Sequence, residues 1–425
     1  MIEITTCTGC SLLCDDVKVV VEDGRIVKNF GCCIIGTERI KVMSSESRLR
    51  NYTAIVEGTE KVLSPDEAAE QAAELLKVAR KPLLYGWCNA TCEAINLGLK
   101  IARKLGGIFD SPLSLYYGYA IMEAKRHKTY EVTLDEVREE ADHIIFWGAN
   151  PAETFHRHMS KFSVFPRGLK AERGVESRIL TVVDVRQTRT VAHNRLIVEL
   201  REDRRLMETL AFMVETGQYP SQYELSIPLR RISSLVRDLK RSSFTAIFYG
   251  LGLLGGGKAK ANLEALYKLV EALKKAGVKC VAMPLPGHYN SIGFIETALK
   301  EAGKPYAIDF SNGETKHDPT QTSAVAALSR DLVDAALILG SNPLASLPAI
   351  VAEKLAKLPM AAIDYVETLT VNRAKLKIPT TISGFESGGT VYRVDGVQVQ
   401  LKPVVKPPEG LLSDEEFLRK VYEML

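Results

Sequence analysis

The amino-acid sequence predicts a mixed α/β protein, in which a small β-rich N-terminal domain precedes interleaved doubly wound parallel-sheet domains. Short apolar runs recur along the chain and end in Gly, Asn, Asp or Pro, and helical stretches separate several of them. Runs that are apolar throughout are typical of strands buried on both faces, as in parallel sheets covered by helices. The runs are Leu83–Gly86, Ile144–Gly148, Leu180–Asp184, Ala246–Gly250, Cys280–Pro284, Ala336–Gly340 and Ala361–Asp364.

Composition limits the classes of protein to which the chain can belong. Its 425 residues, 46% hydrophobic and 25% charged, form a globular mixture large enough for about two to four domains. The 55 Lys and Arg residues nearly balance the 52 Asp and Glu residues, so nucleic acid and membrane surfaces are not expected partners. No apolar run approaches the ~20 residues that span a bilayer, and Met1–Ile4 does not resemble the start of an export signal. We therefore expect a soluble cytoplasmic protein.

The first segment is predicted to form a β-hairpin. Val17–Val21 and Arg25–Val27 are rich in β-branched residues, and they flank Glu22-Asp23-Gly24. Asp-Gly between two such runs is a strong hairpin signal. Cysteines lie on both sides of this hairpin, so folding can bring them to one place.

Helix signals and a change of pattern near residue 55 organise the rest of the chain. Ser64 is a good N-cap, with Pro65 in the first turn and Glu67 three residues after the cap. Further helices are expected over Ala261–Ala276 and from about Ser413, and no internal repeat is apparent. The domains that we expect are 1–55, 56–135 completed by 290–425, and 136–289.

Five of the eight cysteines lie within the first 33 residues. Such crowding in a cytosolic chain indicates a metal site rather than disulfides. The spacing lacks the two CxxC pairs of a zinc ribbon, so it favours an iron–sulfur cluster over structural zinc. Cys88 and Cys92 are interpreted as small buried side chains rather than a second metal or redox pair. The expected cluster ligands are Cys7, Cys10, Cys14 and Cys33, and Cys32 competes for the fourth position.

Polar residues also gather where several predicted strands end, which is where doubly wound sheets bind ligands. Asn, His, Arg and Ser groups at one sheet edge suit a large polar ligand that carries phosphate or a polar heterocycle. His156 and His158 could instead form a metal pair, or simply be exposed polar residues. The loops are Trp147–Pro151 with His156–Ser160 and Phe165–Gly168, Asp184–Thr188, Pro286–Asn290 and Gly340–Pro343.

Several motifs together resemble the B subunit of formylmethanofuran dehydrogenases, in the molybdopterin oxidoreductase superfamily. The resemblance covers nearly the whole chain, and its most specific part is Trp147–Pro151 with Arg157–Ser160 and Ser163–Gly168. The other matching stretches are Cys7–Cys10, Cys14–Asp16, Cys33–Gly36, Gly86–Trp87, Thr91–Ala94, Gly287–Asn290 with Gly293–Phe294, and Gly389–Arg393.

The resemblance implies the cofactors, the reaction and the partners. In that family a [4Fe–4S] cluster passes electrons to tungsten or molybdenum held by two pyranopterin guanine dinucleotides, and the metal reduces CO2 reversibly to formate. Other subunits of a formylmethanofuran dehydrogenase-type complex are the implied partners. The implied cluster ligands are again Cys7, Cys10, Cys14 and Cys33. The implied dinucleotide-binding residues are Asn150, Arg157, His158, Ser160, Asp184, Gly287, His288 and Asn342.

Three positions nearest the family's chemistry differ from its pattern. Tyr116 stands where the family has a metal-binding Cys or selenocysteine, Tyr117 where it has His, and Pro286 where it has Arg. A phenol, with an ordinary pKa near 10, is a poorer metal ligand at neutral pH than a thiol, and proline offers no cation to hold CO2 or formate. The sequence therefore leaves two functions open. One is a tungsten or molybdenum oxidoreductase subunit, and the other is a redox-inactive B subunit, as in a formyltransferase/hydrolase complex, that retains the cluster motif.

Overall fold

The computed structural model describes residues 1–425 except 191, 193, 200–201 and 221–224. The chain forms two compact units, which we describe separately. Unit 1 contains residues 1–115, 288–393 and 398–425, and unit 2 contains residues 116–287 and 394–397. The first division between them thus falls about 20 residues earlier than the expected one at 135. The reason is that residues after 115 pack on unit 2: the Tyr249 hydroxyl donates to the Ala120 carbonyl, and Thr129 to the Ala282 carbonyl.

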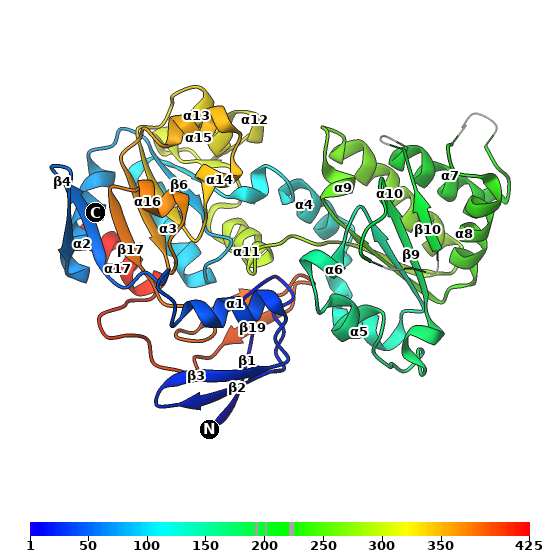
Figure 1. Ribbon diagram of the computed structural model, residues 1–425. Helices are drawn as coiled ribbons and strands as arrows, with labels where there is room; N and C mark the ends of the chain where they lie inside the picture. Colours follow the sequence, from blue (N-terminus) through cyan, green and yellow to red (C-terminus); the bar gives the residue numbers. More distant parts are fainter. Residues whose placement is uncertain (191, 193, 200–201, 221–224) are drawn as a thin grey trace. The chain divides into compact units, whose positions relative to one another are not determined.

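The expected hairpin is present at the start of unit 1. Asp23 and Gly24 both have positive φ, 47° and 72°, and they connect two antiparallel strands. A third strand pairs with the first strand of the hairpin, which completes a small sheet drawn in blue in Figure 1. The strands are β1 (Ile2–Thr5), β2 (Val17–Glu22) and β3 (Arg25–Phe30), and helix α1 (Ile34–Val42) follows.

The core of unit 1 is a nine-stranded sheet with five adjacent parallel strands at its centre. The parallel strands are fully buried along most of their length, as continuous apolar runs require. In sheet order the strands are β14 (Lys316–His317), β13 (Ile308–Asp309), β7 (Ile108–Asp110), β6 (Pro82–Gly86), β15 (Ala335–Leu339), β16 (Met360–Asp364), β17 (Leu376–Pro379), β4 (Tyr52–Val56) and β5 (Thr59–Leu63). A separate two-stranded sheet contains β18 (Gly389–Tyr392) and β19 (Gln398–Leu401).

Two helices of unit 1 begin where the sequence predicts them. Ser64 caps the helix that starts at Pro65 and Ser413 the helix that starts at Asp414, and each forms a capping box with a Glu three residues later. The longer helices are α2 (Pro65–Lys77), α3 (Cys92–Leu105), α11 (Ser291–Ala302), α13 (Ala324–Ser329), α15 (Ala349–Leu355) and α17 (Asp414–Met424). The short helices near the strand ends include α14 (Pro343–Ser346) and α16 (Leu369–Arg373).

Unit 2, green in Figure 1, contains a five-stranded sheet in which every pairing is parallel. Its sheet order is β10 (Asn194–Ile197), β9 (Ile179–Asp184), β8 (His143–Trp147), β11 (Phe244–Tyr249) and β12 (Lys279–Pro284). Apolar residues of the sheet and of three long helices form one core. The helices of this unit include α4 (Gly118–Arg126), α5 (Leu134–Glu140), α6 (Pro151–Thr154), α7 (Asp203–Thr216), α8 (Leu229–Arg241), α9 (Leu251–Leu254) and α10 (Ala259–Lys275).

The predicted α/β class and the parallel sheets are therefore confirmed. All seven apolar runs form strands, and each run begins and ends within two residues of its strand. Among the described residues, no helix is long and apolar enough to cross a membrane.

Candidate functional site

Each of the two large sheets has a topological switch point, where the order in which the chain adds strands reverses direction. Ligand sites of doubly wound proteins lie at such points. In unit 1 this point lies between β6 and β15. The Trp87 amide donates to the Leu339 carbonyl, and the Asn89 side-chain amide donates to the Gly340 carbonyl at 3.0 Å. A Cβ at Gly86 would lie 2.1 Å from the Leu339 carbonyl oxygen, so only glycine allows these loops to approach so closely.

In unit 2 the corresponding point lies between β8 and β11. The Gly250 amide donates to the Trp147 carbonyl, and the Gly252 amide donates to the Gly148 carbonyl. A Cβ at Gly148 would lie 2.6 Å from the Leu253 amide nitrogen. Glycine therefore brings two strand-end loops together in this unit as well.

The loops Gly340–Pro343 and Gly148–Pro151 have the same structure. Both begin with a glycine at positive φ, 56° and 54°, and both continue with an Asn whose Oδ1 accepts a 2.8 Å hydrogen bond from a threonine hydroxyl. In each, the amide two residues after the Asn donates to that same threonine oxygen. In each, the glycine amide also donates to the carbonyl just before a strand-end aspartate. The matched residues are Asn342, Thr370 and Asp364 in unit 1, and Asn150, Thr190 and Asp184 in unit 2.

This duplication corrects the expectation that the chain has no internal repeat. The repeated elements are Gly-x-Asn-Pro after one strand, and Asp-x-x-x-Thr-x-Thr at the end of the next. The second element reads Asp184–Thr190 in unit 2 and Asp364–Thr370 in unit 1. The repeat escapes sequence inspection because the spacing between its two elements differs in the two units, while the spacing within each element is kept. Asp364, Thr190 and Thr370 are therefore candidate site residues that the sequence analysis missed.

The N-terminal thiols lie close together in unit 1. A Cβ placed at Gly36 would lie 2.6 Å from Cys7 Sγ and 3.2 Å from Cys32 Sγ, so this glycine leaves space for two thiols. Burial raises the pKa of Cys10, and the neighbouring thiols Cys14, Cys7 and Cys33 raise it further. The pKa of Cys32 is raised by its contact with Cys7 first and by burial second. Folding thus gathers five sulfur donors around one place.

These donors suit an iron–sulfur cluster by their chemistry. All eight cysteines lie among the described residues, and none of them forms a disulfide. Within the described part of the chain, however, no group of three or more Cys, His, Asp or Glu side chains has an arrangement that could hold a metal ion. The assignment of Cys7, Cys10, Cys14 and Cys33 therefore stays a prediction. Cys88, 2% exposed, is buried as expected, whereas Cys92 is only partly buried.

An arginine contacts the tyrosine that directly follows strand β16. The guanidinium carbon of Arg39 lies 4.6 Å from the ring centroid of Tyr365 and 5.3 Å from that of Tyr289. Its Nη1 donates to the Tyr365 hydroxyl at 3.0 Å, and its buried Nε has no hydrogen-bond partner among the residues that the structure describes. Arg39 is also within electrostatic range of both Cys7 and Asp364. Its positive charge therefore acts on both a thiol of the group and the strand-end carboxyl of the repeat.

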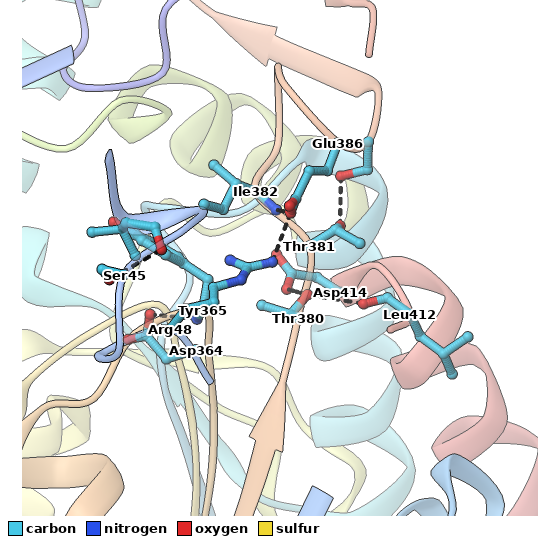
Figure 2. Close-up of polar contacts among 12 residues, drawn as sticks. Ser45, Arg48, Asp364, Tyr365, Thr380, Thr381, Ile382, Glu386, Leu412 and Asp414 are labelled. Carbon is cyan, nitrogen blue, oxygen red and sulfur yellow. Dashed lines mark hydrogen bonds and ion pairs between the residues drawn. The ribbon is translucent and has the colours of Figure 1, made fainter. Parts of the chain in front are cut away.

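Buried charges surround the same strand end, as Figure 2 shows. Arg48 Nη2 donates to Glu386 Oε2 at 2.7 Å, with the two side chains 0% and 3% exposed. Burial raises the pKa of Asp364 to about 7 and that of Asp414 to about 6. Asp414 accepts a 2.6 Å hydrogen bond from the Thr380 hydroxyl. Arg48 Nε and Nη1 are buried and have no hydrogen-bond partner within the described residues, which leaves two N–H donors of this region unused.

The structure places the expected dinucleotide-binding residues of unit 2 in different surroundings. Asn150 Nδ2, at the end of β8, is buried and has no hydrogen-bond partner among the described residues, and Asp184 ends β9 with its pKa raised by burial. His158 lies in the core between two phenylalanine rings, 5.5 and 4.3 Å from its own, and burial lowers its pKa to about 3. Ser160 is exposed, and Arg157 is partly buried. Asn150 and Asp184 are thus brought together, while His158 has the environment of a core residue.

The remaining expected positions are divided between the two units. Within unit 1, His288 Nδ1 lies 3.2 Å from the Asn89 side-chain amide, at the topological switch point. Gly287 is exposed and Pro286 is buried, both in unit 2. Tyr116 is 48% exposed. Tyr117 packs against the core of unit 2, and burial raises the pKa of its hydroxyl, so that it stays a neutral phenol at neutral pH.

Two sheets with parallel central strands, which carry the same strand-end loops, define a two-unit α/β protein. The chain is 36% identical to the B subunit of tungsten-containing formylmethanofuran dehydrogenase 2 from Methanocaldococcus jannaschii, over 99% of this chain and 98% of the relative. It is 34% identical to the subunit of the same name from Methanococcus maripaludis, over 98% of each chain. The chain belongs to the family of formylmethanofuran dehydrogenase B subunits, although no family model matches it.

Solved structures agree on the fold. A chain of the formyltransferase/hydrolase complex from Methylorubrum extorquens, crystallised with methylofuran, superposes with a TM-score of 0.65 at 19% identity, covering 87% of this chain and 98% of that one. Acetylene hydratase from Pelobacter acetylenicus superposes with a TM-score of 0.72 at 15% identity, covering 99% of this chain and 69% of that one. At such identities the similarity shows the fold alone.

Proposed function

We propose that the chain is the subunit of a formylmethanofuran dehydrogenase-type complex that holds two pyranopterin guanine dinucleotides and one [4Fe–4S] cluster. The observation that carries this proposal is the duplicated site. Two copies of one loop, each with a strand-end aspartate, suit two copies of one ligand. The complex would reduce CO2 reversibly to formate on the way to formylmethanofuran. The crowded thiols suit a reducing compartment, so we place the complex in the cytoplasm.

The residues of each repeat offer what a guanine dinucleotide requires. The carboxylates of Asp184 and Asp364 can accept hydrogen bonds from the N–H groups of a guanine base. The buried Nδ2 of Asn150 has no partner in the part of the chain that the structure describes, and it can donate to an oxygen of the ligand. We assign Asn342 the corresponding role in unit 1, with His288 beside it. Arg157 and Ser160 would contact the dinucleotide of unit 2, and Gly287 would allow the backbone to approach it closely. His158 would act indirectly, by packing in the core beneath the loop that carries Arg157 and Ser160.

The thiols would hold the cluster, with Cys7, Cys10, Cys14 and Cys33 as ligands and Cys32 as the competitor for the fourth place. When bound, the cofactors would supply electron transfer through iron and two-electron chemistry at tungsten or molybdenum. Arg39, within electrostatic range of Cys7 and Asp364, places one positive charge near a site that gathers thiolate charge. It thereby favours the ionised thiols that metal binding requires.

A second candidate is a redox-inactive B subunit, and the side chains at the family's metal position favour it. Tyr117 is a buried neutral phenol, and Tyr116 is half exposed, so neither resembles a thiolate ligand. Pro286 provides no cation for CO2 or formate. These residues do not fit a protein-ligated tungsten or molybdenum, so we derive no catalytic step at that metal. In this alternative the complex acts on formyl groups through its other subunits.

Metal analysis of the purified complex distinguishes the two candidates. The oxidoreductase subunit predicts about four iron atoms, one tungsten or molybdenum atom and two guanine nucleotides per chain. Iron without heavy metal or guanine nucleotide would instead establish the redox-inactive subunit. Iron and guanine nucleotide without tungsten or molybdenum would show that the repeats bind the dinucleotides although the chain has lost the metal that reduces CO2.

Replacement of one thiol tests the cluster separately. Cys7→Ser should remove the visible absorption of the cluster and most of the iron, because Cys7 contacts both Gly36 and Cys32 at the centre of the thiol group. Cys88→Ser is the matched control, since Cys88 is a buried thiol outside this group. Equal iron content in the Cys7→Ser variant and the unmodified chain would show that the ligands are wrongly assigned.

A further inference from the structure

The small N-terminal sheet has one buried face and one exposed face, and the exposed face is unusually apolar. Thr5, Val17 and Val19, on the buried face, are 5%, 0% and 0% exposed. On the opposite face Ile2 and Ile4 are 67% and 64% exposed. In a sheet with one face in solvent, the side chains on that face are normally polar, so two exposed isoleucines indicate a surface that another molecule covers.

Strand register shows that these isoleucines belong to a continuous patch. Ile2 pairs with Val20, which pairs with Lys28, and Ile4 pairs with Lys18, which pairs with Phe30. Residues that pair across strands point to the same face, so the six side chains form two adjacent rows. Phe30 is 46% exposed, and the Lys28 ammonium lies 4.8 Å from the centroid of its ring. We call Ile2, Ile4, Lys18, Val20, Lys28 and Phe30 the hairpin face.

The composition of this face identifies the kind of surface that would cover it. Four of its residues are apolar and the other two are lysines, with no acidic residue among the six. A complementary surface therefore has an apolar centre and carboxylates placed opposite Lys18 and Lys28. A self-complementary contact between two copies would instead bring these lysines near one another, which like charge disfavours.

We propose that the hairpin face docks a different subunit of the complex, through a contact surface that is apolar with acidic residues at its edge. The proposal rests on membership of a multi-subunit complex and not on which cofactors are bound. The same three strands lead into the thiols, because Cys7 follows β1, Cys14 precedes β2 and Cys32 follows β3. Docking would therefore cover the exposed face of the sheet whose strands lead into the thiol group, and solvent would no longer reach that face.

The test is assembly of the complex from co-expressed subunits, with one subunit tagged. Ile4→Lys should weaken the association of this chain with its neighbour at least about tenfold, because it places a charge in the apolar centre. Ile350→Lys is the matched control, since Ile350 is 73% exposed on α15 of the same unit. Thermal unfolding of both isolated variants should match that of the unmodified chain, which separates lost docking from lost folding.

A second pair of variants tests the charges. Lys18→Glu with Lys28→Glu should weaken association more at low salt than at high salt, whereas Lys61→Glu with Lys77→Glu, on exposed residues elsewhere in unit 1, should not. Hydrogen exchange at β1–β3 should also slow on assembly. Unchanged assembly of the Ile4→Lys variant would overturn the proposal, and so would a dimer of the isolated chain that this substitution dissociates. Both readouts are independent of metal content, so this proposal and the proposed function can fail separately.

Discussion

The two repeats share a backbone but differ in their electrostatic surroundings. In unit 1 the strand-end Asp364 is fully buried among charged groups and has a pKa of about 7. In unit 2 Asp184 is only partly buried, and although burial raises its pKa, the backbone amides it accepts from and the charge of Arg186 oppose that shift. The loop geometry is thus a property of the Gly-x-Asn-Pro and Asp-x-x-x-Thr-x-Thr elements. The ionisation of the strand-end aspartate is set instead by the groups that pack around it, which in unit 1 include Arg39.

Loss of the buried arginine should show the largest difference between the units. Arg48→Ala leaves the Glu386 carboxylate buried without its partner, which should destabilise unit 1 by about 3–5 kcal/mol. The double variant Arg48→Met with Glu386→Gln removes both charges and should recover much of this loss. Urea unfolding can follow each unit separately, because the two tryptophans of the chain, Trp87 and Trp147, are buried in units 1 and 2.

Single-tryptophan variants, Trp147→Phe to observe unit 1 and Trp87→Phe to observe unit 2, provide the readout. An equal loss of stability in both units on Arg48→Ala would contradict the division of the chain into separately stabilised units. The expected result is a loss confined to the transition reported by Trp87.

The pH dependence of stability should have opposite signs in the two units. In unit 1, burial raises the pKa of Asp364 to about 7, so the folded state binds more protons than the unfolded one and stability falls as pH rises from about 4 to 7. In unit 2, burial lowers the pKa of His158 to about 3 and that of His143 to about 4. The unfolded state then binds more protons, and stability falls as pH drops below about 6.5.

Unfolding of the single-tryptophan variants at several pH values measures both slopes. Asp364→Asn should flatten the slope of unit 1 and stabilise it at pH 8, whereas His158→Gln should flatten that of unit 2. Slopes of the same sign in both units would show that these buried groups do not dominate the titration.

The smallest expected effect concerns the threonines that hold the two asparagines. Thr190→Val removes the hydroxyl that donates to Asn150 Oδ1, at a cost of about 1–1.5 kcal/mol in unit 2. Thr370→Val should cost less, about 0.5–1 kcal/mol in unit 1, because the Thr370 amide still donates to Asn342 Oδ1 at 3.2 Å. Serine at either position keeps the hydroxyl and serves as the control. A larger loss of stability for Thr370→Val than for Thr190→Val would show that the Thr370 amide does not compensate for the lost hydroxyl.

Much of the fold can be predicted from local sequence. The strand Leu83–Gly86 and its six counterparts are predictable because apolar runs bounded by turn residues depend only on nearby sequence. Ser64 with Glu67 and Asp23 with Gly24 are recognisable for the same reason. Of the site, Asn150, Asp184 and Asn342 are indicated by their places after predicted strands. Asp364 is visible in the sequence only as the end of a strand, since the partner loop that gives it a role lies across the sheet.

The sequence by itself determined the elements, the crowding of cysteines in the first 33 residues and the family to which the chain belongs, because each is encoded in contiguous residues. Only the tertiary structure decided that Gly-x-Asn-Pro and Asp-x-x-x-Thr-x-Thr form two equivalent pairs of strand-end loops, that Arg39 is within electrostatic range of both Cys7 and Asp364, and that His158 is a core residue. These facts depend on contacts between residues far apart in the chain, and on how burial shifts the ionisation of their side chains. Neither is a property of local sequence.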